Sequence, residues 1–426
     1  MASYRSGDAM QPLVFAILKS LTPKDFEISF YDDRVEELNF TEPTDLVAIT
    51  CGTFTAKRAY QIAGYYRKKN VPVVMGGYHP TLLPDEAKLF ADAVIIGSAE
   101  SVWQQVLEDF QKNELKPFYH GENDGDGLHS SYDYSIFEGK KYFPVNLVEW
   151  GRGCRHHCDF CSVQAFNKGK EMLRPVKDVI ADISKLDNKP VFFVDDNLYH
   201  DKRLFRDLLI DLIPLKKRWA CQISVEVTHD EELLGLMQQS GCMMALLGIE
   251  SFDSGNLKLM NKSWNFDIGK YREAIQRLRE RHIMVYGTFI FGYDHDTPED
   301  FKKSVDFAIK SKLFIANFNP LYPMPGTKLY ERLEAENRLI YQKWWLDPDF
   351  YYGKTMFRPV PFSPEDLEKH CLDAKRKFNS FASILYRARD FSANLHGKTN
   401  AAFFLLTNLT NRREIFKKQG KKLGTS

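Results

Sequence analysis

Short apolar runs alternate with polar, helix-compatible stretches along the first 125 residues of the chain. The runs cover residues 26–32, 45–51, 71–77 and 91–97. Gly, Pro or Asp bounds them, which is typical of strands in a parallel sheet that is buried on both faces. Residues 56–69 have the pattern of a crossover helix between two such strands. The pattern therefore predicts a doubly wound α/β domain, with ligands at the carboxyl ends of its strands.

A second alternation of apolar runs and helical stretches begins near residue 140. Strands are predicted at 142–150, 190–196, 219–227, 243–250, 284–292 and 313–320. Helical patterns lie between most of them, at 201–213, 229–240, 267–282 and 298–311. Six strand–helix repeats predict a partial (βα)6 TIM-like barrel, whose chemistry belongs at the C-terminal rim of the strands.

The pattern changes again beyond about residue 350, where two helices without intervening strands are predicted at 364–389 and 398–420. In the first of these, apolar residues recur at helical spacing. We therefore expect one apolar face to be turned toward the barrel, with Phe378, Phe381, Ile384 and Leu385.

These patterns divide the chain into three parts. The predicted domains are residues 1–125, the barrel at 126–350 and a helical C-terminal segment at 351–426, with the polar, turn-rich stretch 122–128 as the first linker.

Composition narrows the class of protein. The 58 basic and 57 acidic residues nearly cancel, so nucleic-acid binding is not expected. Seven cysteines are too few for a disulfide scaffold and fit a reducing compartment. The chain has no run of about 18 apolar residues and no signal-peptide pattern at its start, so we expect a cytoplasmic protein.

The C-terminal tail is locally basic. Residues 411–426 carry six Lys and Arg side chains against the single acidic residue Glu414. Such a tail is either a solvated, frayed terminus or a site of weak peripheral contact with an anionic membrane.

Three cysteines crowd into the loop after the first barrel strand. Cys154, Cys158 and Cys161 form a C-x3-C-x2-C pattern. Short spacers let three thiolates converge on three corners of a [4Fe–4S] cubane, which leaves the fourth iron open to a small-molecule ligand. The alternative is a zinc site in which His156 or His157 supplies a fourth ligand.

This loop resembles the cluster motif of the radical S-adenosylmethionine (SAM) superfamily. The resemblance implies that SAM binds the open iron and that one-electron cleavage of SAM gives a 5′-deoxyadenosyl radical, which abstracts hydrogen from the substrate. It also implies that Phe160, inside the last spacer, lies beside the adenine of SAM.

Other strand ends offer groups that suit SAM, if the barrel is formed as predicted. Asp195 and Asp196 follow the second strand, where the resemblance implies contact with the SAM amino group. Glu250 and Ser251 end the fourth strand and suit ribose hydroxyls, although either pair could instead cap a helix. Further candidates are Gln222, Gly287, Ile290 and Arg174.

The N-terminal domain resembles the cobalamin (B12)-binding, Rossmann-like domain of B12-type radical SAM enzymes, through the run 75–87 and then 91–100. Gly76, Gly77 and Gly97 would let the backbone approach the corrin or its nucleotide tail. The Asp-x-His-x-x-Gly motif that supplies a cobalt ligand in many corrinoid proteins is absent, and His79 lies in a different place, where a turn-stabilising role is expected. Cobalamin bound without a histidine ligand and a domain that only supports the barrel both stay open.

The sequence thus predicts a radical SAM enzyme that functionalises an unactivated carbon of a lipid or natural product, by C-methylation if cobalamin binds. A flavodoxin or ferredoxin would be its reductant. The competing hypotheses are a zinc- or cluster-stabilised binding protein and a corrinoid carrier without radical chemistry.

Overall fold

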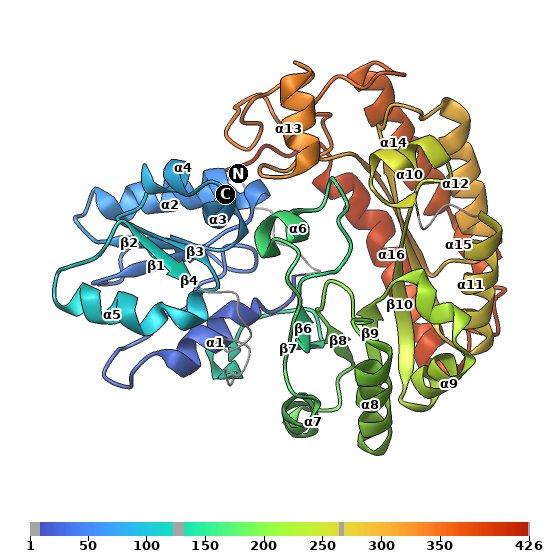
Figure 1. Cartoon of the computed structure of the whole chain (residues 1–426), viewed down its shortest axis with the longest axis horizontal. Coiled ribbons are helices and arrows are strands. Elements are labelled where there is room, and N and C mark those ends of the chain that lie inside the picture. Colours follow the sequence, from blue (N-terminus) through green and yellow to red (C-terminus); the bar gives the residue numbers. More distant parts are fainter. Residues whose placement is uncertain (1–8, 122–131, 264–267, 425–426) are drawn as a thin grey trace.

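The computed structural model describes residues 9–121, 132–263 and 268–424 of the chain. The predicted linker at 122–128 lies outside these residues. A smaller α/β unit lies beside a larger one, and the C-terminal helices lie with the larger one (Figure 1).

The smaller unit is built on a four-stranded parallel sheet. Its strands follow in chain order, namely β1 (Val47–Thr50), β2 (Val73–Gly76), β3 (Ala93–Gly97) and β4 (Phe118–Gly121). One face packs against α2 (Ala56–Arg67), α3 (Tyr78–Leu82) and α4 (Pro84–Lys88). The other packs against α1 (Leu13–Leu21) and α5 (Trp103–Gln111) (Figure 1). The predicted parallel sheet with helices on both faces is confirmed.

One predicted strand of this domain is wrong and one strand was missed. Residues 26–32 pair with no described strand. Phe30 instead packs on the rings of Phe15 and Phe137, and Ile28 is exposed. This run is therefore a loop and not a strand of the sheet. The missed strand, β4, has the sequence Phe-Tyr-His-Gly and lacks the run of aliphatic residues that marks β1, β2 and β3.

The larger unit confirms the predicted partial barrel. Its six parallel strands have the order β12-β11-β10-β9-β8-β5, which leaves β12 and β5 at the two edges. Their bounds are Asn146–Val148 (β5), Val191–Phe193 (β8), Trp219–Gln222 (β9), Cys242–Glu250 (β10), Met284–Phe291 (β11) and Ile315–Pro320 (β12). The helices between them are α7 (Val176–Lys185), α8 (Lys202–Leu212), α9 (Glu231–Gln239), α10 (Ser254–Leu259), α11 (Ile268–Glu280) and α12 (Pro298–Lys310).

The predicted first barrel strand, 142–150, is shorter in the structure, where β5 covers only Asn146–Val148. After β5 the chain forms β6 (Gly151–Arg152), which pairs antiparallel with β7 (Met172–Leu173). This small ribbon leads the chain from the rim of the sheet into the cysteine loop.

The C-terminal segment consists of α14 (Pro364–Phe378), α15 (Phe381–Arg387) and α16 (Gly397–Lys418), preceded by α13 (Lys328–Ala335). The predicted helix 364–389 is broken, because the Ser380 side chain accepts a hydrogen bond from the Ser383 amide and starts a new helix. Phe378 and Ile384 are buried as expected. The expectation for Phe381 and Leu385 is wrong, since they are 58% and 68% exposed.

Residues between α13 and α14 reach back to the N-terminal domain. Trp344, Trp345, Phe350 and Met356 are buried in the same apolar cluster as α2 and β2. The N-terminal domain and this segment therefore share a core, which is separate from the core of the barrel. Among the described helices, none combines the length and apolar character needed to cross a bilayer.

Candidate active site

The cysteine loop lies between β6 and α6 (Ser162–Asn167) at the rim of the barrel. Cys154, Cys158 and Cys161 are half-buried and form no disulfide. The loop is held by neighbouring segments, because the Asp159 amide donates to the Met260 carbonyl (3.1 Å) and the Leu329 amide donates to the Asp159 carbonyl (3.0 Å).

The donor set fits an iron–sulfur cluster. Burial, with a smaller contribution from charge on the other loop cysteines, raises the pKa of Cys154 to about 11 and of Cys158 to about 12. No group of three or more His, Cys, Asp or Glu side chains in the described ranges is placed to hold one metal ion. A cubane does not need three side chains on one metal ion, because each of its irons binds its own thiolate.

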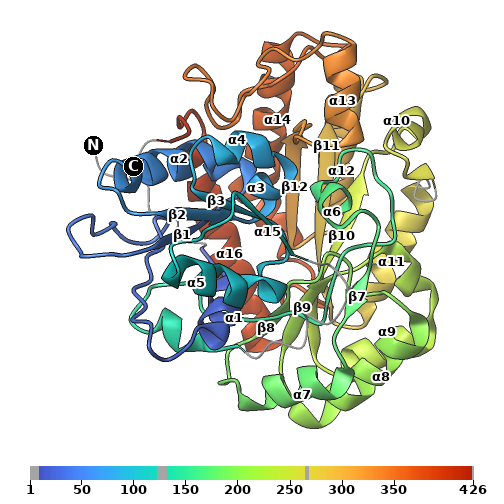
Figure 2. The same cartoon turned by 60° about the vertical axis from the view of Figure 1, so that its left-hand side comes forward.

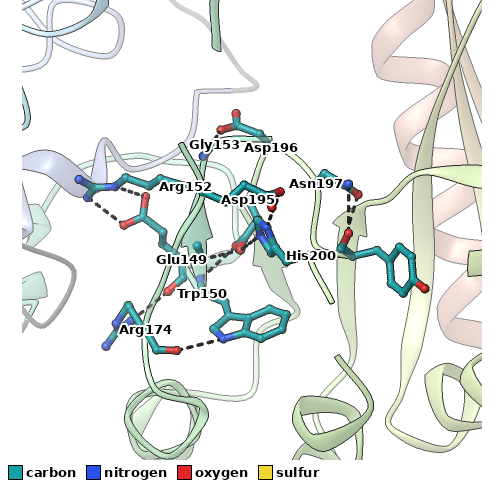
Figure 3. Close-up of polar contacts among 12 residues, drawn as sticks. Glu149, Trp150, Arg152, Gly153, Arg174, Asp195, Asp196, Asn197 and His200 are labelled. Carbon is teal, nitrogen blue, oxygen red and sulfur yellow. Dashed lines mark hydrogen bonds and ion pairs between the residues drawn. The ribbon is translucent and has the colours of Figure 1, made fainter. Parts of the chain in front are cut away.

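The end of β8 fixes the start of the loop (Figure 3). Asp195 is buried, and its carboxylate accepts from the amides of Trp150 (3.0 Å) and Gly151 (2.5 Å). Asp196 is half-buried and accepts from the Gly153 amide (3.1 Å). Burial, with Asp195 and Glu149 nearby, raises the pKa of Asp196 to about 6. Asp195 thus holds the loop backbone through hydrogen bonds, and Asp196 is the more exposed carboxylate near the cysteines.

His200 completes this arrangement and was not predicted. It is buried, with Nε2 3.6 Å from Asp195 and Nδ1 3.1 Å from Glu171. Glu171 in turn accepts from the amide of Arg155, inside the cysteine loop (3.0 Å). Burial opposes the charge of His200, but hydrogen bonds and charge from Asp195 and Glu171 raise its pKa. A sequence pattern could not reveal this bridge, because its partners come from separate segments.

The next strand ends also hold polar groups. Gln222 ends β9, and its side-chain amide donates to the Asp195 carbonyl (3.3 Å). Glu250 ends β10, is buried, and has a left-handed φ of 65°. It pairs with Lys262 (3.0 Å), whose charge counteracts the rise in the pKa of Cys158. Lys262 is a second group near the cysteines that no motif indicated.

The remaining barrel candidates are mostly packed. Ser251 accepts from the Asp253 amide (3.1 Å), in the turn that precedes α10. Phe160 and Ile290 are half-buried against the main apolar cluster. A Cβ on Gly287 would lie 2.8 Å from Leu313 Cδ1 and 3.1 Å from Ile249 Cδ1, so close packing favours a glycine there.

Arg174, the candidate partner for the SAM carboxylate, is already engaged. Its guanidinium pairs with Asp182 (2.5 Å) and donates to the Glu149 carbonyl (3.0 Å), beside Trp150 (Figure 3).

In the N-terminal domain, the predicted glycines lie at the carboxyl edge of the sheet. Gly76 ends β2 and Gly97 ends β3. Gly77 has a φ of 99°, and a Cβ there would lie 2.6 Å from Thr50 Oγ1 and 2.9 Å from the Cys51 carbonyl oxygen. The backbone at Gly77 therefore packs directly against Thr50 and Cys51, with no room for a side chain between them.

His79 lies inside the domain, not at this edge. It is fully buried and contacts Tyr60 (3.0 Å) and Glu86 (3.1 Å) through Nε2. Trp345 also donates to Glu86 (2.8 Å). His79 thus joins α2, α3 and α4 to the segment after α13, in agreement with the expected stabilising role.

Two contacts bring the carboxyl edge of the N-terminal sheet against the cysteine loop. Arg152, two residues before Cys154, pairs with Glu100 (2.7 Å), just beyond β3, and with Glu149 (2.7 Å). Tyr78, directly after Gly77, stacks on Phe166 of α6 with ring centroids 4.5 Å apart. Both ends of the cysteine loop are therefore fastened to the same edge, and α3 lies beside α6 in both views (Figure 1 and Figure 2).

Comparison with known proteins agrees with this arrangement. The family model of the radical SAM superfamily matches residues 148–308, and that of the B12 binding domain matches residues 11–107. The bacteriochlorophyllide d C-12(1)-methyltransferase of Chlorobaculum tepidum is 30% identical over 90% of this chain and 85% of its own length. The bacteriochlorophyllide d C-8(2)-methyltransferase of the same organism is 27% identical over 78% of each chain.

Among solved structures, the radical SAM methyltransferase TsrM from Kitasatospora setae superimposes with a TM-score of 0.61 at 15% identity, over 87% of this chain and 80% of that chain. Its similarity supports the fold. With the sequence similarity over nearly the whole chain, the two domain matches and the cluster loop, the chain belongs to the radical SAM enzymes that carry a B12-binding domain ahead of the barrel.

Proposed function

We propose that this enzyme is a C-methyltransferase that takes the methyl group of SAM and passes it, by way of cobalamin, to a carbon of a tetrapyrrole. One observation carries the proposal. The edge of the B12-binding domain is fastened to both ends of the cysteine loop, by Arg152 with Glu100 and by Tyr78 with Phe166. A methyl carrier must reach both SAM and substrate, and a site between this edge and the loop allows both.

The roles of the residues follow from their positions. Cys154, Cys158 and Cys161 would ligate the cluster. When bound, the cluster and SAM supply the radical that removes a substrate hydrogen, and cobalamin carries the methyl group. Asp196, with Gln222 and Glu250 on the neighbouring strand ends, would orient SAM, while Asp195 and His200 hold the loop in place.

In the N-terminal domain, we propose that Gly76, Gly77 and Gly97 line the corrinoid. The proposed contacts of SAM also include Phe160, Ser251, Gly287 and Ile290. The proposed domain boundaries lie after residues 125 and 350. A flavodoxin or ferredoxin is the proposed reductant.

Similarity to relatives favours the substrate class. The two relatives described above methylate bacteriochlorophyllide d, a large flat apolar macrocycle with polar edges. A hopanoid-like lipid is the second candidate, because the Hopanoid C-2 methylase of Rhodopseudomonas palustris is 23% identical over 78% of this chain.

The test is anaerobic reconstitution with iron, sulfide and hydroxocobalamin, followed by SAM, dithionite and bacteriochlorophyllide d. We expect 5′-deoxyadenosine and a product heavier by one CH2 unit. Cys158→Ala should lose both products, because one corner of the cluster loses its thiolate. Cys371→Ala, which removes a buried cysteine in α14, is the matched control and should keep both.

The outcomes separate the hypotheses. Protein that keeps its cluster and binds SAM but never cleaves it would contradict the catalytic assignment. Formation of 5′-deoxyadenosine with loss of hydrogen from the substrate and no added carbon would indicate ring formation instead of methylation. SAM turnover that survives in Cys158→Ala would favour a corrinoid carrier.

A further inference from the structure

The helices α15 and α16 expose an unusual number of large apolar side chains. Leu406 is 67% exposed, and several other large apolar side chains of these two helices are exposed as well. We name as the C-terminal apolar face the side chains of Phe381, Leu385, Leu405, Leu406 and Leu409. Isolated exposed leucines are ordinary, whereas a cluster marks a surface that contacts something other than water.

These side chains belong to one surface. The two helices lie against each other, since Arg387 of α15 donates to Asn408 of α16 (2.9 Å). The Arg412 guanidinium of α16 lies 4.3 Å from the centre of the Phe381 ring. Leu405, Leu409 and Arg412 are spaced three and four residues apart, so they follow one side of α16.

The opposite side of these helices is already occupied. Phe404 and Ile384 are buried in a cluster with Met244 and Met284 of the barrel sheet. Asn408 donates to the Phe314 carbonyl (3.2 Å) at the start of β12. The C-terminal apolar face thus points away from the barrel sheet and is not part of its packing.

The exposed charged side chains of the segment that carries this face have one sign. Arg389, Lys398, Arg413 and Lys417 are exposed. Over residues 379–415 the only acidic side chains are Asp390 and Glu414, and both are buried. Asp390 pairs with Arg279 (2.8 Å) and Glu414 pairs with Lys417 (2.9 Å). A partner for this surface must therefore be apolar in the middle and anionic around it.

We propose that the C-terminal apolar face docks on the surface of an anionic lipid bilayer. Leucine and phenylalanine side chains would enter the interface between headgroups and acyl chains, while the basic side chains contact the lipid phosphates. A second copy of the chain fits less well. A two-fold contact places the same patch against itself, so basic side chains would oppose basic side chains with no exposed carboxylate between them.

This inference does not depend on the proposed methyl transfer. Docking would bring the enzyme to lipophilic substrates, but the surface lies on the C-terminal helices and not at the cysteine loop. Binding to bilayers and turnover of a soluble substrate can therefore fail separately.

The test is flotation of the full chain with vesicles of phosphatidylcholine alone and with a mixture of phosphatidylcholine and phosphatidylglycerol. We expect binding to the mixture only, and weaker binding at high salt. Each basic side chain near an anionic surface contributes a factor of about five to the binding constant. The double variant Lys398→Gln/Arg413→Gln should therefore bind about 25-fold more weakly.

A second variant removes the apolar part. Leu405→Gln/Leu406→Gln/Leu409→Gln keeps helix-favouring residues at exposed positions, so α16 should still form. It should lose binding to mixed vesicles by more than about tenfold. The matched control is Leu89→Gln, which changes a leucine that is 71% exposed on the N-terminal domain and should leave binding unchanged.

Three results would overturn the proposal. One is equal binding to both kinds of vesicle. Another is undiminished binding of the leucine variant with an unchanged circular dichroism spectrum. The third is a native mass of two chains that the same leucine substitutions reduce to one, which would assign the face to self-association.

Discussion

At the scale of single residues, Arg152 links the two domains directly beside the cysteine loop. Burial opposes its charge, but Glu149 and Glu100 raise its pKa well above the ordinary value, so the guanidinium stays ionised. Removing one member of a buried ion pair leaves its partners charged and unpaired, which costs about 3–5 kcal/mol. Glu100 and Glu149 would be those partners.

We predict that Arg152→Gln lowers the stability of the protein and loosens the B12-binding domain from the loop. SAM cleavage should continue, while methylated product per 5′-deoxyadenosine falls several-fold. Thermal unfolding and product ratios measure the two effects. Arg206→Gln, which breaks the exposed pair with Glu232, is the control and should change stability by less than about 1 kcal/mol. An unchanged product ratio in Arg152→Gln would show that the pair does not position the domains.

His200 gives a prediction for pH. Its pKa in the folded protein is raised above the ordinary value of 6.5 by Asp195 and Glu171. The stabilisation from protonated His200 is therefore fully present below the unfolded pKa and is lost as the pH rises through the folded pKa. His200→Gln should cost about 1–3 kcal/mol near pH 5.5 and less near pH 8.5. Urea unfolding at both pH values is the measurement, and a cost that grows with pH would contradict it.

At the scale of elements, the turns at the strand ends determine which groups face the site. β2 ends in Gly76 and Gly77, and the chain then starts α3 with Tyr78, which stacks on Phe166. The left-handed φ of Gly77 lets the chain make this turn in close contact with Thr50 and Cys51. The geometry of one turn therefore brings an aromatic contact to α6.

We predict that Gly77→Ala costs about 1–3 kcal/mol, because the new Cβ meets strained backbone and two oxygen atoms. Gly76→Ala is a closely matched control. Its Cβ would lie 3.7 Å from Ile95 Cβ, an ordinary contact, so stability should change by less than about 1 kcal/mol. Chemical denaturation compares the two. Equal costs would mean that the turn does not require a glycine at position 77.

At the scale of the whole molecule, the segment between α13 and α14 makes the two units one folding unit. Trp344 and Trp345 are buried in the apolar cluster of the N-terminal domain, and the Trp345 ring nitrogen donates to Glu86. Glu86 also pairs with Lys343 (2.9 Å) and with His79. Unfolding of either unit therefore exposes surface of the other.

We predict that Trp345→Ala costs about 3–5 kcal/mol through loss of buried aromatic contacts. The N-terminal domain should then unfold at a lower temperature than the barrel, so that one calorimetric transition becomes two. Trp103→Phe, in the N-terminal domain but outside this interface, should keep a single transition. A single transition in Trp345→Ala would contradict the shared core.

Features that depend on local spacing could be predicted from the sequence alone. Short apolar runs bounded by turn-forming residues located the barrel strands and three strands of the N-terminal sheet, because a parallel strand that is buried on both faces needs consecutive apolar residues. The cysteine loop was also local, since three thiols within eight residues converge in any compact loop. The same logic failed for Phe381 and Leu385, because the break at Ser380 turned them outward.

The partner of each polar group depends on the packing of the folded chain. Asp195 and Asp196 are equivalent in the sequence, yet one is buried on the loop backbone and the other lies more open beside the cysteines. The pair of Arg152 with Glu100, the pair of Lys262 with Glu250 and the contact of His200 with Glu171 join residues at least 12 positions apart in the chain. A charged side chain is satisfied by whichever group packing brings within about 3 Å, and no local pattern carries that information.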